Sequence, residues 1–75
     1  MATLADFTPR ELKILQLVVA GLTNKAIAAE LYVSEKTVEF HLDHIYTKLG
    51  VRKRIMVGIW AIQHGMKPEY RDSPS

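Results

Sequence analysis

Basic side chains are concentrated in one short segment of the chain. Four of the seven residues from Lys48 to Arg54 are basic, namely Lys48, Arg52, Lys53 and Arg54. Ammonium and guanidinium groups attract phosphates, so this segment is a candidate contact for a nucleic acid backbone. An ordinary solvated loop would have the same composition. The formal net charge is only +2, and it does not decide between the two interpretations.

The sequence contains few groups suited to catalysis or to metal binding. It has no cysteine, which excludes disulfides, thiolate metal ligands and a cysteine nucleophile. The three histidines, His41, His44 and His64, are not grouped with acids at metal-ligand spacing, and there is no glycine-rich phosphate loop. We therefore expect no enzyme activity, no metal site and no cofactor.

Length and hydropathy indicate one small globular domain. The chain has 75 residues, of which 48% are hydrophobic, and this suits a single domain with a modest core. Its apolar runs are shorter than the roughly 18 residues of a membrane-spanning helix, and its start lacks the pattern of a signal peptide. These features lead us to expect a cytoplasmic protein with no membrane partner.

Apolar residues at helical spacing predict an all-α fold. The four expected helices cover residues 9–20, 24–31, 35–49 and 53–64. Capping residues support these bounds: Thr8 and Glu11 fit a capping box around Pro9, and Thr23 and Ser34 suit helix starts. Glycines suited to helix ends are Gly21, Gly50 and Gly65.

The helix expected over residues 35–49 has two different sides. On a wheel of about 100° per residue, its apolar stripe consists of Val38, Leu42, Ile45 and Leu49. The opposite side carries Lys36, Phe40, Asp43 and Thr47, flanked by Glu39 and His44. In and just after the first helix, the apolar residues at helical spacing are Leu12, Leu15, Val19 and Leu22, with Val18 beside them.

The helices over residues 24–31 and 35–49 follow each other across a short turn, as in a helix-turn-helix. The small residues Ala28 and Ala29 allow a second helix to pass closely, and Val33 offers an apolar contact in the turn. This geometry leaves the outer side of the second helix available to a DNA major groove. A plain helical bundle would follow the same core rules.

Three segments together resemble the LuxR-type DNA-binding domain. They run from Leu22 to Ala28, from Val33 to Leu42 and from Ile45 to Val51, with Thr8-Pro9-Arg10-Glu11 and Arg54 also matching. The resemblance implies a four-helix domain over residues 8–66, after a lead over 1–7 and before a flexible tail over 67–75. It also implies a bacterial transcription regulator that binds double-stranded DNA, with residues 34–48 in the major groove. RNA polymerase is a further partner expected on this basis.

The resemblance assigns roles to individual residues. Those expected to face bases are Lys36, Glu39, Phe40 and Asp43. Those expected to contact phosphates are Lys25, Ser34, Thr37, Lys48, Arg52 and Lys53. Arg54 matches a family position whose role is structural, and Tyr46 is expected to pack within the domain instead of stacking on a base.

Acidic residues on the outer side depart from the family pattern, in which lysine is common at the positions of Glu39 and Asp43. Residues 34–48 contain two basic and three acidic side chains, a balance of −1, and acids weaken attraction to phosphates. Glu39 either accepts a hydrogen bond from cytosine N4 or is simply solvated. Phe40 either contacts a thymine methyl or sugar, or packs against a neighbouring side chain. A protein-binding adaptor that has lost DNA binding is the alternative function.

The helix over residues 53–64 is apolar nearly all round. In the family, the side with Val57, Gly58 and Ala61 packs inward, and the resemblance implies a homodimer through the other side. The expected interface residues, taken to face outward, are Met56, Ile59, Trp60 and Ile62. Burial within one protomer, or against a further domain, would explain the same pattern.

Overall fold

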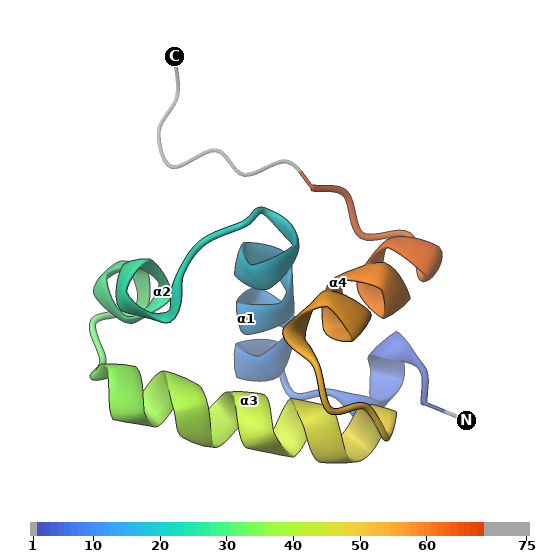
Figure 1. Ribbon diagram of the computed structural model, residues 1–75, viewed down its shortest axis with the longest axis horizontal. Helices are drawn as coiled ribbons and strands as arrows, with labels where there is room; N and C mark the ends of the chain where they lie inside the picture. Colours follow the sequence, from blue (N-terminus) through green and yellow to red (C-terminus); the bar gives the residue numbers. More distant parts are fainter. Residues whose placement is uncertain (1, 69–75) are drawn as a thin grey trace.

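The computed structural model describes residues 2–68, and within them it contains helices and no β-strand, which confirms the all-α class. A short 3₁₀ turn comes first, and the α-helices that follow have bounds within one residue of the expected ones. The elements are η1 (Leu4–Asp6), α1 (Pro9–Val19), α2 (Asn24–Leu31), α3 (Glu35–Leu49) and α4 (Arg54–Gln63) (Figure 1).

Two expectations about the chain as a whole concern its tail and membranes. The flexible tail expected over residues 67–75 falls mostly on residues 69–75, which lie outside the described part of the chain. Among the described helices, none combines the length and the apolar character needed to cross a bilayer.

Side-chain caps fix where the helices begin. The Thr8 hydroxyl accepts a hydrogen bond from the Glu11 backbone N–H at 3.1 Å, and the Thr8 backbone N–H donates to Glu11 Oε1 at 2.9 Å. This is the expected capping box, and it satisfies two backbone donors that the first turn leaves without partners. Thr23 caps α2 and Ser34 caps α3 through their side-chain oxygens.

Helix α1 is the centre of the fold. It packs against α2, α3 and α4, and Figure 1 shows it standing between α2 and α4 above α3. The expected stripe on α1 is therefore too narrow: Ile14 and Leu17 are fully buried, whereas Leu12 and Val19 are only partly buried. A helix with neighbours on three sides buries most of its circumference, and a single-stripe pattern cannot describe it.

Helices α2 and α3 form the helix-turn-helix. Ala28 is buried and Val33 packs against the core, as expected, but Ala29 is exposed. Tyr32 ends α2 in the left-handed conformation, with φ 59°. The chain therefore reverses sharply before Ser34 and begins α3 at a fixed angle to α2.

The first residues of the chain also belong to the fold, although the sequence suggested no periodicity there. Phe7 follows η1 and is buried in the core. Its ring centroid lies 5.5 Å from that of Trp60 in an edge-to-face arrangement. The N-terminal segment thus covers part of α4.

Candidate nucleic-acid interface

The outward side of α3 is accessible along its length. Val38 and Ile45 are fully buried, Leu42 is nearly so, and Leu49 is partly buried against the core, which confirms the inward stripe. The four residues expected to face bases are all exposed: Lys36, Glu39, Phe40 and Asp43. Because they lie opposite the stripe on one helix, the fold brings them together on one face.

Phe40 is both exposed and packed. The residue is 58% exposed. Its ring centroid lies 4.6 Å from that of His44 and 5.7 Å from that of His41. Neighbouring rings therefore restrict its orientation and leave much of its surface available for an apolar contact.

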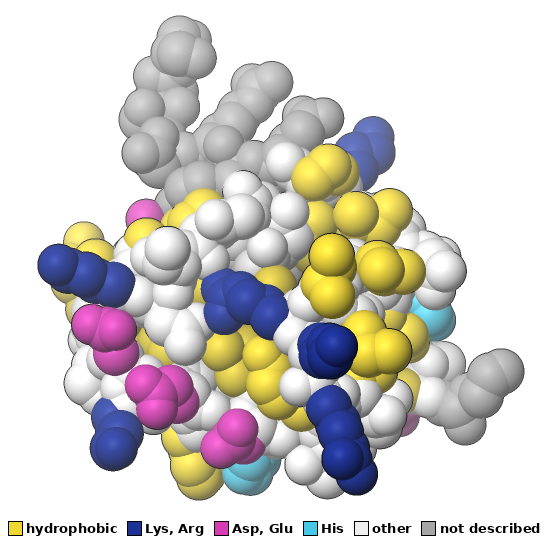
Figure 2. Space-filling model, in the orientation of Figure 1, with side chains coloured by type: hydrophobic (Ala, Val, Ile, Leu, Met, Phe, Trp, Pro, Cys, Tyr) yellow, Lys and Arg dark blue, Asp and Glu magenta, His cyan; other side chains and the backbone are white. Residues whose placement is uncertain are grey.

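Charges of both signs lie near this helix. Figure 2 shows acidic and basic side chains interspersed over α2 and α3, and an apolar patch over α4. The acidic groups on the outer side of α3 separate its cations from one another. Any attraction for a polyanion must therefore come mainly from the flanking residues.

The beginnings of α2 and α3 present cations and backbone donors. Lys25 is exposed in the first turn of α2. Ser34 accepts from the Thr37 backbone N–H at 3.1 Å, and the two hydroxyl oxygens are 3.1 Å apart. Helix N-termini favour anions, so the first turn of α2 and the first turn of α3 both suit phosphate groups.

Lys48 is not a free surface cation, because its ammonium group contacts α1 and the N-terminal segment. Its ammonium is 2.6 Å from Glu11 Oε1, donates to the Asp6 carbonyl at 3.1 Å and lies 5.4 Å from the centre of the Phe7 ring. Glu11 is a residue that the sequence suggested only as a cap. Its partner Lys48 is 37 residues away, so no short sequence pattern around Glu11 predicts the pairing.

The pKa of Glu11 reflects this environment. Burial raises the pKa of the carboxyl, because the charged form is poorly solvated. The Lys48 ammonium and the backbone and hydroxyl groups of Thr8 lower it by more. The net pKa is below its ordinary value, so Glu11 is ionised and paired at neutral pH.

Arg54 has a structural role, as expected. Its guanidinium donates to Asn24 Oδ1 and to the Leu22 carbonyl, each at 2.6 Å. These bonds tie the start of α4 to the start of α2. Arg52 and Lys53, by contrast, are exposed in the turn before α4, beside α3.

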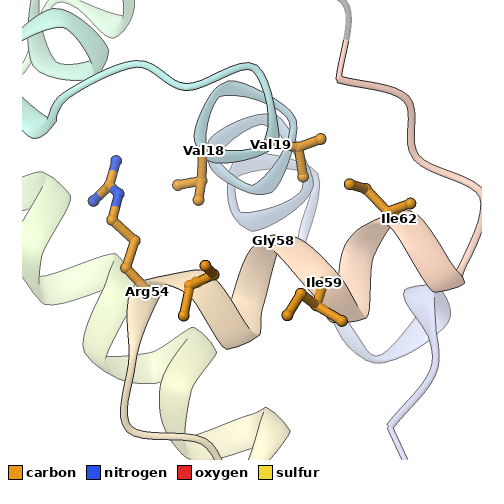
Figure 3. Close-up of a pocket in the computed structure, with 7 residues that line it drawn as sticks. Val18, Val19, Arg54, Gly58, Ile59 and Ile62 are labelled. Atoms are coloured by element: carbon orange, nitrogen blue, oxygen red, sulfur yellow. The ribbon is translucent and has the colours of Figure 1, made fainter.

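Helix α4 carries an apolar face with a groove beside α1. Val57 and Ala61 are buried, as the family pattern implied, whereas Gly58 is partly buried and lines the groove. The groove has a volume of about 480 Å³ and runs past Arg54. Figure 3 shows Val18 and Val19 of α1 on one side of it and the α4 residues on the other. Its apolar lining consists of Val18, Val19, Ile55, Gly58, Ile59 and Ile62.

Trp60 faces outward less than expected, since it is partly buried. Its ring packs against the core beside Phe7 and stacks on His64, with the ring centroids 3.9 Å apart. Met56, Ile59 and Ile62 are exposed, as expected. Ile55, which was not among the expected interface residues, is 70% exposed. The N-terminal segment explains the difference, since it covers the Trp60 side of α4.

Within residues 2–68, the histidines and acids form no group of three or more that could hold a metal ion. Along one side of α3 the fold brings together cations, hydroxyls, an exposed aromatic ring and the carboxylates of Glu39 and Asp43. The cations and hydroxyls can bind anions, the ring can contact an apolar surface, and the carboxylates can accept hydrogen bonds.

Comparisons with known proteins match most of the chain. A family model described as bacterial regulatory proteins of the luxR family matches residues 5–61. The response regulator Rre1 of Synechocystis sp. is 46% identical over 61 residues, which are 81% of this chain and 26% of that protein. The transcriptional regulatory protein LnrK of Bacillus subtilis is 41% identical over 63 residues, 84% of this chain and 29% of that protein.

A further relative is the nitrate/nitrite response regulator protein NarL of Escherichia coli. It is 41% identical over 58 residues, which are 77% of this chain and 27% of that protein. The chain therefore spans less than a third of the length of these three relatives.

Proposed function

This chain belongs to the LuxR family of bacterial regulatory proteins, and we propose that it binds duplex DNA sequence-specifically with α3 in the major groove. Its helix-turn-helix is a DNA-binding unit of transcription regulation. The observation that carries the proposal is the outward side of α3, which is exposed along its length opposite the stripe that packs into the core. A helix presented in this way fits the width of the groove.

In this proposal the groups flanking α3 contact the DNA backbone. Lys25 and the first backbone N–H groups of α2 bind one phosphate, and Ser34 and Thr37 lie near another. Arg52 and Lys53 extend the contact beyond the end of α3. Lys48 adds at most one N–H, because Glu11 and the Asp6 carbonyl already take two of its three.

The exposed middle of α3 would select the sequence. Phe40 suits a thymine methyl or a sugar, because its ring is held in place and remains accessible. Glu39 and Asp43 can accept from cytosine N4, and Lys36 can donate to guanine or to a phosphate. The acids repel phosphates in general, so they favour sequences that offer them a donor.

Selection of bound sequences from a random DNA pool, followed by salt titration on the winners, tests this proposal. We expect a short motif whose affinity falls steeply with salt. Phe40→Ala should relax the preference at one position, while Lys25→Ala should weaken all sequences alike. Absence of any DNA binding at low salt would favour the alternative of a protein-binding adaptor. Transcription with purified RNA polymerase on the selected DNA tests the further partner.

Homodimerisation through α4 is part of the same proposal. An exposed apolar face beside an apolar groove usually marks an interface, and a two-fold dimer matches two-fold DNA sites. The support is the exposure of Ile55, Met56, Ile59 and Ile62. Trp60 is at most a peripheral member, because it packs within the protomer.

Ultracentrifugation tests the dimer directly. Ile59→Ser should weaken self-association, since it removes apolar surface from the centre of the face without touching the core. Tyr32→Ser is the matched control, because it removes an exposed apolar side chain from the helix-turn-helix instead. Equal sedimentation of the wild type and both variants would contradict the α4 interface.

A further inference from the structure

A small hollow lies on the flank of α3 near its C-terminal end. It is lined by His44, Thr47 and Lys48 and has a volume of about 260 Å³. On the helix wheel, His44 lies roughly 40° from Phe40 on one side and roughly 40° from Lys48 on the other. When the outer side of a helix enters the groove, its flanks face the DNA backbone, so this hollow would face phosphates.

Two of the three lining residues already donate hydrogen bonds within the protein. The Thr47 hydroxyl donates to the Asp43 carbonyl at 2.9 Å. Lys48 donates to Glu11 and to the Asp6 carbonyl. If Lys48 turned fully to a phosphate, it would leave a carboxylate that is only 3% exposed without its partner, which is costly.

His44 is different. It is exposed, and its ring nitrogens make no hydrogen bond or ion pair with any residue between 2 and 68. Its ring packs against Phe40 with centroids 4.6 Å apart, which limits the directions that the imidazole can take. Histidine is also the side chain whose charge changes near neutral pH, and a neighbouring phosphate favours its protonated form.

We propose that His44, rather than Lys48, is the principal phosphate-contact residue at this end of α3, and that it binds a DNA phosphate as an imidazolium. This inference rests on the proposed function. Binding then takes up a proton, so affinity rises as the pH falls through the range in which histidine titrates. The contact also adds a positive charge to a helix that otherwise has a balance of −1.

His41, one turn before His44 on α3, packs against the same Phe40 ring and is the second imidazole near the hollow. The remaining charged groups near the hollow do not change sign in that range. Asp43 and Lys48 come from α3, Glu11 from α1 and Asp6 from the N-terminal segment. In the part of the chain that the structure describes, α2 and α4 contribute no residue to the lining. Carboxylates remain ionised and lysine remains protonated between about pH 6 and about pH 8.

The test measures the affinity for the selected DNA from about pH 8 to about pH 6 at constant ionic strength, by fluorescence anisotropy. Wild-type affinity should rise by up to about tenfold per pH unit, the limit for one linked proton. His44→Gln should flatten this profile. At low pH it should also reduce the salt slope, which is the slope of log affinity against log salt concentration, by about one. His64→Gln is the matched control, because it removes another exposed histidine, one that stacks on Trp60.

The outcomes separate this inference from the proposed function. DNA binding with equal pH profiles for the wild type and His44→Gln would overturn the inference and leave the function intact. Absence of DNA binding by the wild type at every pH would overturn both. A folded Lys48→Met variant that loses a full unit of salt slope at high pH, while His44→Gln loses none at low pH, would assign the contact to Lys48 instead.

Discussion

The Lys48 ammonium lies 2.6 Å from the Glu11 carboxylate, and the same carboxylate oxygen accepts the Thr8 backbone N–H. One side chain therefore caps α1 and holds the C-terminal end of α3. Glu11 is buried, whereas the Lys48 side chain is 34% exposed. This pair fixes the end of α3 relative to the centre of the fold.

We predict that Lys48→Met destabilises the domain by about 1–2 kcal/mol. The variant leaves the buried Glu11 carboxylate without its strongest partner, and the partial exposure of Lys48 keeps the cost below that of a fully buried pair. Urea denaturation measures this loss of unfolding free energy. Lys36→Met is the control, since Lys36 is exposed on the outer side of α3. Equal midpoints for the two variants would refute the structural importance of the pair.

The lowered pKa of Glu11 predicts a pH dependence of stability. Because the folded-state pKa lies below its ordinary value, the unfolded chain binds the proton more readily. The stabilisation is fully present above the ordinary range of glutamate and is lost as the pH falls through the folded-state pKa. The difference in unfolding free energy between the wild type and Glu11→Gln should therefore shrink from neutral to acidic pH. A constant difference would contradict the assignment.

Arg54 and Arg52 should fail in different ways, although both are arginines near the start of α4. Arg54→Ala removes bonds to Asn24 and Leu22, and we expect a loss of about 1–3 kcal/mol in stability. Arg52→Ala should leave stability unchanged and lower DNA affinity and its salt slope. Denaturation and DNA titration on both variants check this, and a stability loss in Arg52→Ala would be the contrary result.

Gly58 offers a way to test the α4 groove without disturbing the core. A Cβ at this position would meet nothing within 4 Å, so Gly58→Ala should stabilise the monomer by about 0.5–1 kcal/mol through helix propensity. Gly58→Glu should keep the fold and weaken self-association, because it brings a charge into an apolar groove. Thermal unfolding and sedimentation measure the two effects, and unchanged association of Gly58→Glu would argue against the interface.

Tyr32 and Gly50 both adopt the left-handed backbone conformation. The conformation strains Tyr32, which has a Cβ, but not Gly50, which has none. Tyr32 has φ 59° and is 94% exposed, and Gly50 has φ 68°. Tyr32→Gly should raise stability, and Gly50→Ala should lower it, each by about 1 kcal/mol, because left-handed backbone strains residues that have a Cβ. Thermal unfolding of the two variants measures this. If both midpoints moved in the same direction, backbone strain would not be the dominant effect.

The sequence by itself determined the helix bounds and the two sides of α3. Caps such as Thr8 with Glu11 act over three residues, and apolar periodicity acts over three or four. Both are local, so they can be recognised without knowing what the helix packs against. The inward position of Val38, Leu42 and Ile45, and the exposure of Phe40 opposite them, followed from the same local geometry.

Only the tertiary structure decided which distant groups meet. Ile14 and Leu17 are buried because α1 has neighbours on three sides, and Trp60 is partly covered because Phe7 docks beside it. Lys48 meets Glu11 across 37 residues. Such contacts depend on how helices are positioned relative to one another, which no short window of sequence specifies. They determine which cations remain available to a phosphate.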